Sequence, residues 1–159
     1  MKKILSILSI LVISSIMIIS VSASSDWRFI YKSYNIPIVT KNPVTWEEVW
    51  GAEGNILLSQ GHFAHAIIRH AQPFTDYTLI YYGDATHNDV WNYATCISSV
   101  TTNNHGNGRT PNGQIDYTGF INDGKAQKFW VVLSNDIDCK NNRMTAWNPT
   151  KYLFETYTI

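Results

Sequence analysis

Short runs of β-branched and aromatic residues, each followed by turn-forming residues, repeat along the chain from Trp27 onward. Such runs are typical of strands, and many of them at short spacing are typical of antiparallel sandwiches and barrels. The runs that we predict as strands are residues 27–34, 36–40, 62–71, 77–83, 90–100, 114–122, 127–134 and 151–158. We therefore predict one mainly β domain over residues 24–159, an antiparallel β-sandwich or barrel with one short helix at most.

Residues 43–53 are the place for that helix. Thr45 and Glu48 have the spacing of a capping box, and Val49 follows Trp46 on one helical face. The same aromatic and β-branched residues suit a strand equally well. A short helix and a strand are both left open here.

Turn residues predict how the runs are joined. Pro37 suits an edge strand because it has no N–H to donate. Residues 73–76 predict an antiparallel hairpin between the runs on either side, and Asp123-Gly124 is the preferred two-residue hairpin turn. The polar residues 101–113 predict a long surface loop, and residues 135–149 a second loop.

The N-terminus has the pattern of a secretion signal. Lys2 and Lys3 precede an apolar run over residues 4–19, and small residues up to Ala23 offer a cleavage site. The alternative is a permanent anchor, but a run of about 16 residues is short of the ~20 that a spanning helix needs. We predict a cleaved signal peptide over residues 1–23, a secreted protein and no stable membrane anchor after cleavage.

Removal of 23 residues from 159 leaves 136, enough for one core, and all 21 aromatic residues lie in this part. Without Lys2 and Lys3, 10 of the 12 basic residues remain against 12 acidic ones. A nearly neutral, slightly acidic surface does not attract phosphate backbones, so nucleic-acid binding is disfavoured.

Cys96 and Cys139 are the only cysteines. In an exported protein the default state of such a pair is a disulfide, which we predict here. The alternative is a free catalytic thiol with a histidine partner.

Five histidines are the first candidates for chemistry. On a strand, His62 and His70 share a face but lie roughly 26 Å apart, while His65 points the other way. On a helix, His62 and His65 would be neighbours that could hold zinc. Because we favour the strand, we predict no metal site and no cofactor; His87 and His105 lie further on in loops.

A metal-free acid–base site would combine histidine with a cation for an anionic group. His65, Arg69 and His105 are the candidate catalytic residues, with Glu47 and Glu48 as further acids. This combination defines the hydrolase alternative.

The Gly-rich residues 103–109 contain His105 and Arg109 and could place backbone N–H groups around an anion. They lack the lysine of a phosphate-binding loop, so a P-loop is excluded. A solvated loop is the simpler interpretation.

Aromatic side chains suggest binding instead. Trp130 lies in a continuous apolar run and is predicted to be buried, whereas Tyr81, Tyr82 and Trp147 flank turns. The candidate binding residues are Tyr81, Tyr82, Trp147, His105 and Arg109.

Two short motifs also resemble a known group. Trp46-Glu47-Glu48-Val49, after the signal and a short strand, and the loop from Thr101 to Gly106 near a cysteine are similar to the YolA-like family of small secreted proteins of unknown function from Bacillus and its relatives. The similarity covers most of the mature chain. It implies an exported bacterial protein and transfers no activity and no catalytic residue.

We expect a secreted, noncatalytic β domain that binds a glycan, a cell-wall component or a protein. The alternatives are a small secreted hydrolase that uses histidine acid–base chemistry and a secreted toxin or bacteriocin.

Overall fold

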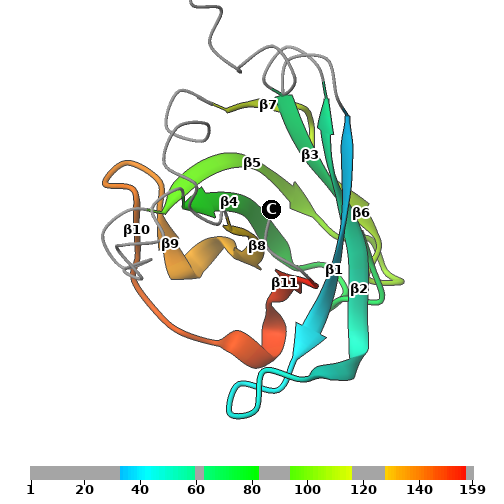
Figure 1. Ribbon diagram of the computed structural model, residues 1–159. Coiled ribbons are helices and arrows are strands. Elements are labelled where there is room, and N and C mark those ends of the chain that lie inside the picture. The colour runs from blue at the N-terminus through cyan, green and yellow to red at the C-terminus, as the bar shows by residue number, and fades with distance from the viewer. Residues whose placement is uncertain (1–32, 60–62, 83–93, 116–127, 157–159) are drawn as a thin grey trace, which may run out of the picture.

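A computed structural model describes residues 33–59, 63–82, 94–115 and 128–156 (Figure 1). The predicted signal peptide and the Asp123-Gly124 turn lie outside these ranges. The strands are β1 (Tyr34–Lys41), β2 (Glu48–Ser59), β3 (Phe63–Arg69), β4 (Asp76–Tyr82), β5 (Thr95–Thr101), β6 (Gly108–Arg109), β7 (Gly113–Gln114), β8 (Lys128–Leu133), β9 (Ile137–Asp138), β10 (Arg143–Met144) and β11 (Leu153–Glu155). Two short 3₁₀ turns, η2 (Ser134–Asp136) and η3 (Pro149–Lys151), are the helical elements of the described ranges. The mainly β prediction is confirmed, and none of the helices described here has the length and apolar character needed to cross a membrane.

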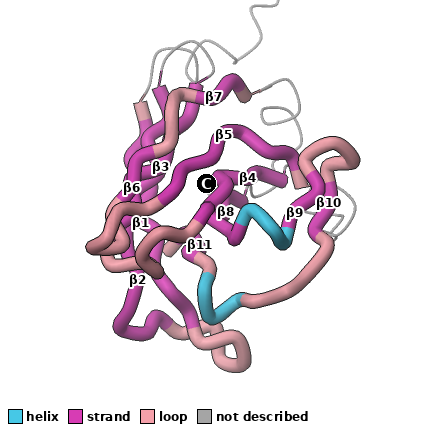
Figure 2. Tube along the Cα trace, turned by 180° about the vertical axis from the view of Figure 1, so that it is seen from behind, coloured by secondary structure: helices cyan, strands magenta, loops and turns pink. Residues whose placement is uncertain are grey.

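The strands form one antiparallel sheet that curls on itself (Figures 1 and 2). Its order is β5-β4-β8-β11-β1-β2-β3-β6, and β7 pairs with β3 beside β6. The β9 and β10 strands form a separate hairpin. The part predicted as a second loop, residues 135–149, therefore contains a short hairpin.

Close packing at two glycines brings the ends of the sheet together. A Cβ atom on Gly113 would lie 2.3 Å from the carbonyl oxygen of Ile97, and one on Gly108 would lie 3.2 Å from Cγ2 of Val100. Only glycine lets the β6–β7 segment approach β5 this closely. The sheet is nearly closed into a barrel. Among the described strands, β5 forms backbone hydrogen bonds with β4, so the contact between β5 and the β6–β7 segment consists of side-chain and backbone packing.

Alternating residues of the strands fill the barrel. The buried residues of this core are Ile36, Ile38, Ile56, Leu58, Ala64, Ala66, Ile68, Tyr77, Leu79, Ile115, Phe129, Val131 and Leu153. Burial of this many apolar side chains is the main driving force for folding.

One wall of the barrel is apolar on its outside as well. In β8, Phe129 and Val131 face the interior, while Trp130 and Val132 belong to a second buried cluster on the outer face. Residues 134–152 run across this outer face of β4, β8 and β11 and cover it (Figure 1). Trp130 is buried, as predicted.

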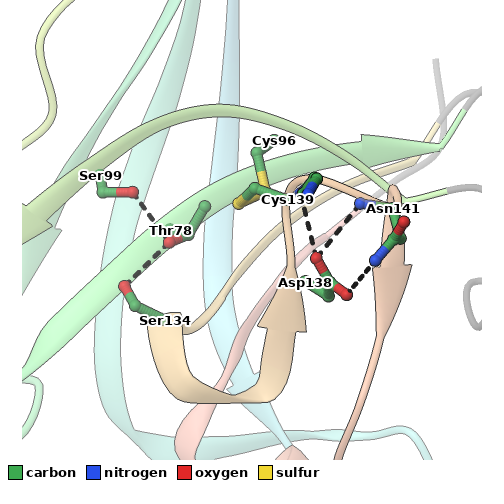
Figure 3. Close-up of a disulfide and its surroundings, with 8 residues drawn as sticks. Thr78, Cys96, Ser99, Ser134, Asp138, Cys139 and Asn141 are labelled. Atoms are coloured by element: carbon green, nitrogen blue, oxygen red, sulfur yellow. Dashed lines mark hydrogen bonds between the residues drawn. A yellow bond between two sulfur atoms is a disulfide. The ribbon is translucent and has the colours of Figure 1, made fainter.

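The predicted disulfide joins Cys96 of β5 to Cys139, with Cα atoms 5.4 Å apart (Figure 3). It fixes the covering segment to the sheet. Next to it, the Thr78 hydroxyl lies 2.9 Å from the Ser99 hydroxyl and 2.8 Å from that of Ser134, which ties β4, β5 and η2 together.

Of the two alternatives left open for residues 43–53, the helix is wrong, and the second half of the segment is strand, because β2 begins at Glu48. The Asn42 side chain accepts the N–H groups of Val44 and Thr45, and its carbonyl accepts the Trp46 N–H, so residues 42–46 form a tight turn. Trp46 has a φ of 59°, outside the right-handed helical region, and β2 begins two residues later. The Thr45 hydroxyl bonds to Glu47 at 3.1 Å, so its side chain caps a turn.

The predicted hairpin between residues 62–71 and 77–83 is also wrong. β3 pairs with β2, β6 and β7, whereas β4 pairs with β5 and β8. The link between them is held by Thr102, which donates to the Gln72 carbonyl at 2.6 Å and accepts from the Thr75 N–H at 3.0 Å. These long-range contacts direct the chain across the barrel.

Pro37 does not lie in an edge strand. β1 is between β11 and β2, and the Pro37 carbonyl accepts the N–H of Thr156 at 3.0 Å. Proline has no N–H group to donate. At Pro37 this N–H would point toward the end of the short β11 strand, so little pairing is lost.

A carboxyl group points into the barrel. Glu155 lies opposite Ile38, whose side chain is in the interior core, and Glu155 is only 7% exposed. Its Oε2 atom has no hydrogen-bond partner among the described residues. Burial raises the pKa of Glu155 to about 7, although backbone hydrogen bonds and Lys128 and Lys41 act in the opposite direction.

The disulfide closes a separation of 43 residues. On the chain-entropy estimate, its loss removes about 4 kcal/mol from the free energy of unfolding. We expect this loss for Cys96→Ser/Cys139→Ser and for the reduced wild-type protein, measured by urea unfolding. An unchanged free energy of unfolding in both would contradict the stabilising role of this bond.

Glu155 makes stability depend on pH. Its pKa is raised from 4.5 to about 7 in the folded state, so folding takes up a proton between these values. The stabilisation is complete below about pH 4.5 and is lost as the pH rises through about 7, a change of at most about 3 kcal/mol. Glu155→Gln should flatten this dependence in urea unfolding at about pH 5 and about pH 8. A variant that keeps the wild-type slope would show that another group titrates.

Candidate functional site on the outer face of the barrel

The strand register places a row of side chains across the outside of the barrel. Arg69 lies opposite Glu53, Glu53 opposite Val39, Val39 opposite Phe154 and Phe154 opposite Trp130. Directly opposite residues share a face, and Phe154 and Trp130 belong to the outer cluster. Since strands are about 4.8 Å apart, this row crosses five strands over roughly 19 Å.

A bulge in β2 shapes one end of the row. Between its pairs at Glu53 and Glu48, β2 carries four residues where β1 carries only Thr40. Thr40 donates its hydroxyl hydrogen to the Ala52 carbonyl at 3.0 Å, and a Cβ on Gly51 would lie 3.1 Å from the Thr40 hydroxyl. Extra residues of this kind turn side chains away from the regular pleat. Gly51 and Ala52 thus hold the bulge against β1, while Val49 and Trp50 extend away from the sheet.

The projecting residues form a pocket of about 220 Å³. Its lining is Val39, Val49, Trp50, Gly51, Ala52, Glu53 and His70. The polar groups are Glu53 and His70; the latter has a φ of 57° and an N–H held by Asn107 Oδ1 at 3.2 Å. A flat ring, an apolar floor and two polar side chains therefore meet at this pocket.

Trp50 is fully exposed, and it is the largest apolar side chain left in solvent among the described residues. Val49 next to it in β2 and Val44 in the turn before β2 are exposed as well. Because hydration of an indole ring is unfavourable, such exposure is typical of a binding surface. The exposure of Trp50 in particular was not predicted, since tryptophan and valine in a β-rich run normally indicate burial.

An aromatic shelf adjoins the pocket; it consists of Trp46, Trp130, Trp147 and Phe154. Phe154 is buried beneath two partly exposed indoles, Trp46 at 47% and Trp147 at 38%. The ring centroids of Trp46 and Phe154 are 5.3 Å apart, those of Trp147 and Phe154 6.4 Å, and those of Trp130 and Phe154 5.0 Å. Phe154 is the direct neighbour of Val39 in the pocket, so shelf and pocket are continuous.

A buried polar network positions the shelf segment. The Asp136 carboxylate accepts hydrogen bonds from the Tyr152 hydroxyl at 2.5 Å and from the Asn148 side chain at 2.8 Å. Burial, and then the hydrogen bond to Asp136, raise the pKa of the Tyr152 hydroxyl, so it stays protonated and donates. Trp147 packs against Tyr152 with centroids 5.6 Å apart. The network therefore holds Trp147 in place.

His65, the candidate acid–base residue, is only 8% exposed. Burial lowers the pKa of its imidazole, and the nearby Arg109 lowers it further, while a hydrogen bond with Asn112 raises it. Its Nε2 atom has no hydrogen-bond partner among the residues described here. His65 is therefore a neutral, covered imidazole beside a cation.

The other two candidate catalytic residues are not brought to His65 by any described contact. Arg69 lies four residues along β3, roughly 13 Å away. His105 is exposed in the loop, where Asn103 Oδ1 accepts the N–H groups of His105 at 2.9 Å and Asn107 at 3.0 Å. The Gly106 N–H bonds to the Asn103 carbonyl. These donors are used within the loop, which disfavours the predicted anion cradle.

The predicted surface loop over residues 101–113 is partly buried. Thr102 and Thr110 are covered, and a Cβ on Gly106 would lie 1.9 Å from the Ala71 carbonyl oxygen. Thr110 bonds to both backbone groups of Ala66 at 2.9 and 3.0 Å. The polar residues pair with backbone and form part of the barrel wall.

Within the described ranges, no three His, Cys, Asp or Glu residues gather as a metal site would require. His62 and His87 lie outside these ranges. Both cysteines are in the disulfide, so the alternative of a catalytic thiol is wrong. Glu47 and Glu48 lie on the exposed turn into β2.

The predicted aromatic binding residues have different surroundings. Tyr81 is partly buried against the barrel core and stacks on Phe129, with centroids 5.8 Å apart, so it is not a surface ring. Tyr82 pairs through its backbone with Lys128, and its side chain is outside the described part. Trp147 is partly exposed on the shelf, and Arg109 lies opposite Ile67 near His65. Sequence reasoning missed Trp50 and Trp46.

The fold and this face define a small, nearly closed antiparallel β-barrel with aromatic side chains on its outer surface. No protein-family model, no curated protein and no solved structure matches the chain. The similarity to the YolA-like family stays a prediction.

The network around Asp136 predicts a stability effect. Asp136→Ala leaves the buried Tyr152 hydroxyl and the Asn148 amide without their acceptor, which costs about 2 kcal/mol of unfolding free energy. Urea unfolding followed by tryptophan fluorescence measures this loss. Asp138→Ala is the matched control, because Asp138 is partly exposed and its carboxylate's hydrogen bonds are to Lys140 and Asn141 in its own turn, so its loss should matter less. Equal effects would argue against a special role for Asp136.

Proposed function

We propose that this chain is an extracellular, noncatalytic binding protein that takes a glycan on the outer face of its barrel. The observation that carries the proposal is the fully exposed Trp50 ring beside a pocket with Glu53 and His70. The C–H face of a sugar ring packs on an indole, while a carboxylate and an imidazole can bond to its hydroxyl groups.

The size and polarity of the pocket favour a sugar over a protein partner. A volume of about 220 Å³ suits a single small ring. A stable protein interface needs roughly 800 Å² on each partner and few charges at its centre. Here Glu53, Arg69 and Glu48 interrupt the apolar surface.

Two features support an extracellular location. Residues 1–23 have the pattern of a cleaved signal peptide. The Cys96–Cys139 disulfide is typical of proteins in oxidising compartments. A cell-wall glycan would be within reach of such a protein.

The hydrolase alternative is supported by one observation, the neutral imidazole of His65 near Arg109. We do not favour it, because His65 is covered and because no described contact joins it to Arg69 or His105. A toxin or bacteriocin stays an untested alternative that would also need a surface for its target.

Trp50→Ala tests the proposal. We expect about tenfold or greater loss of affinity for the glycans and purified cell wall that wild type binds on an array, because stacking contributes roughly 1.5 kcal/mol. Since Trp50 makes few contacts, the melting temperature should stay the same. Phe74→Ala is the matched control: it is 75% exposed and is not part of the pocket. Absence of binding by wild type, or equal effects of both variants, would refute the proposal.

A further inference from the structure

The outer face offers more than one place for a ring. The pocket beside Trp50 accounts for one end of it, while the indoles of Trp46 and Trp147 remain partly exposed on the shelf. Pocket and shelf meet at the Val39–Phe154 pair. From Glu53 to Trp130 the register spans three strand spacings, about 14 Å, which is longer than a single sugar.

Trp46 is held in a costly conformation. A bulky residue with a φ of 59° is strained, and strained residues cluster at binding sites. The Trp46 N–H bonds to the Asn42 carbonyl at 2.8 Å, and its ring packs edge-on to Phe154 with an interplanar angle of 76°. The turn thus presents one side of the indole to solvent while the other is supported.

The charges on this face are mixed. Glu53 and Arg69 lie directly opposite each other, and Glu48 lies opposite Lys41. Opposite charges at these positions offset each other, so no strong field selects an anionic or a cationic polymer. A neutral ligand fits this distribution.

We propose that the ligand is a neutral, linear glycan that crosses the strands, with one sugar in the pocket beside Trp50 and a later sugar against Trp46 and Trp147. This inference rests on the proposed function and specifies its ligand. Strands are ~4.8 Å apart, and one unit of an extended β-1,4-linked chain is similar in length, so successive units follow successive strands. The affinity should therefore increase with the number of sugar units that lie along the row.

The test uses two β-1,4-linked series, glucose and N-acetylglucosamine, each from monomer to hexamer, with the mature protein. Wild type should bind the tetramer of one series about tenfold or more tightly than its monomer. Trp46→Asn removes the indole but tolerates a positive φ. It should lower tetramer affinity toward that of the monomer and leave monomer affinity unchanged. Trp50→Ala should weaken every length.

Phe74→Asn is the matched control, because Phe74 is an exposed ring with a φ of 50° that does not line the pocket. It should change no affinity. Trp46→Gly is a second variant that also accepts the positive φ of this position. Thermal unfolding checks that both Trp46 variants fold. If they bind the tetramer like wild type, or if wild-type affinity is independent of length, the two-subsite inference is overturned and the proposed function stands. If wild type binds neither series nor any glycan on the array, both are overturned.

Discussion

The wall formed by β4, β8 and β11 is apolar on both faces, and this constraint governs the rest of the molecule. Both faces of such a wall must be covered, because each would otherwise expose apolar side chains to water. The barrel interior covers one side, and residues 134–152 cover the other. The covering segment has little regular structure, so it depends on the Asp136 network and on the Cys96–Cys139 bond. The shelf includes a residue of this cover, Trp147, whose indole stays partly in solvent.

Local sequence signals predicted the fold class and the features that depend on residue type alone. The continuous apolar run at Trp130 predicted that its side chain is buried, and the two cysteines predicted the disulfide. Signals failed where a local preference competed with distant contacts. The helix pattern over residues 43–53 did not take into account the Asn42 side chain, which precedes the pattern and closes a turn. The hairpin expected at residues 73–76 ignored Thr102, which lies far along the chain but directs the link away from β3.

The candidate site was less predictable than the fold. Alternation along β4 leaves open which of two successive tyrosines enters the barrel, and Tyr81 does so by stacking on Phe129. Trp50 reaches solvent through a bulge of β2 against β1. Gly51 inside the β-rich run is a local signal of a bulge, but it does not indicate which side chains the bulge turns outward. Trp147, by contrast, was found because it follows a turn-rich segment. Exposure of an aromatic residue depends on strand register, which is set by the whole sheet.

Phe154 gives this surface an unusual dependence on the interior. It is almost completely covered, yet the two exposed indoles of the shelf, Trp46 and Trp147, pack against it, and Val39, its neighbour on β1, lines the pocket. A ligand on this face would never touch Phe154, but the relative placement of its contact points is set by the volume of that one ring. Evolution of a new preference here would therefore be tied to the packing of the barrel wall: a substitution that resizes a hidden side chain reshapes the outer surface, and the two cannot be selected separately.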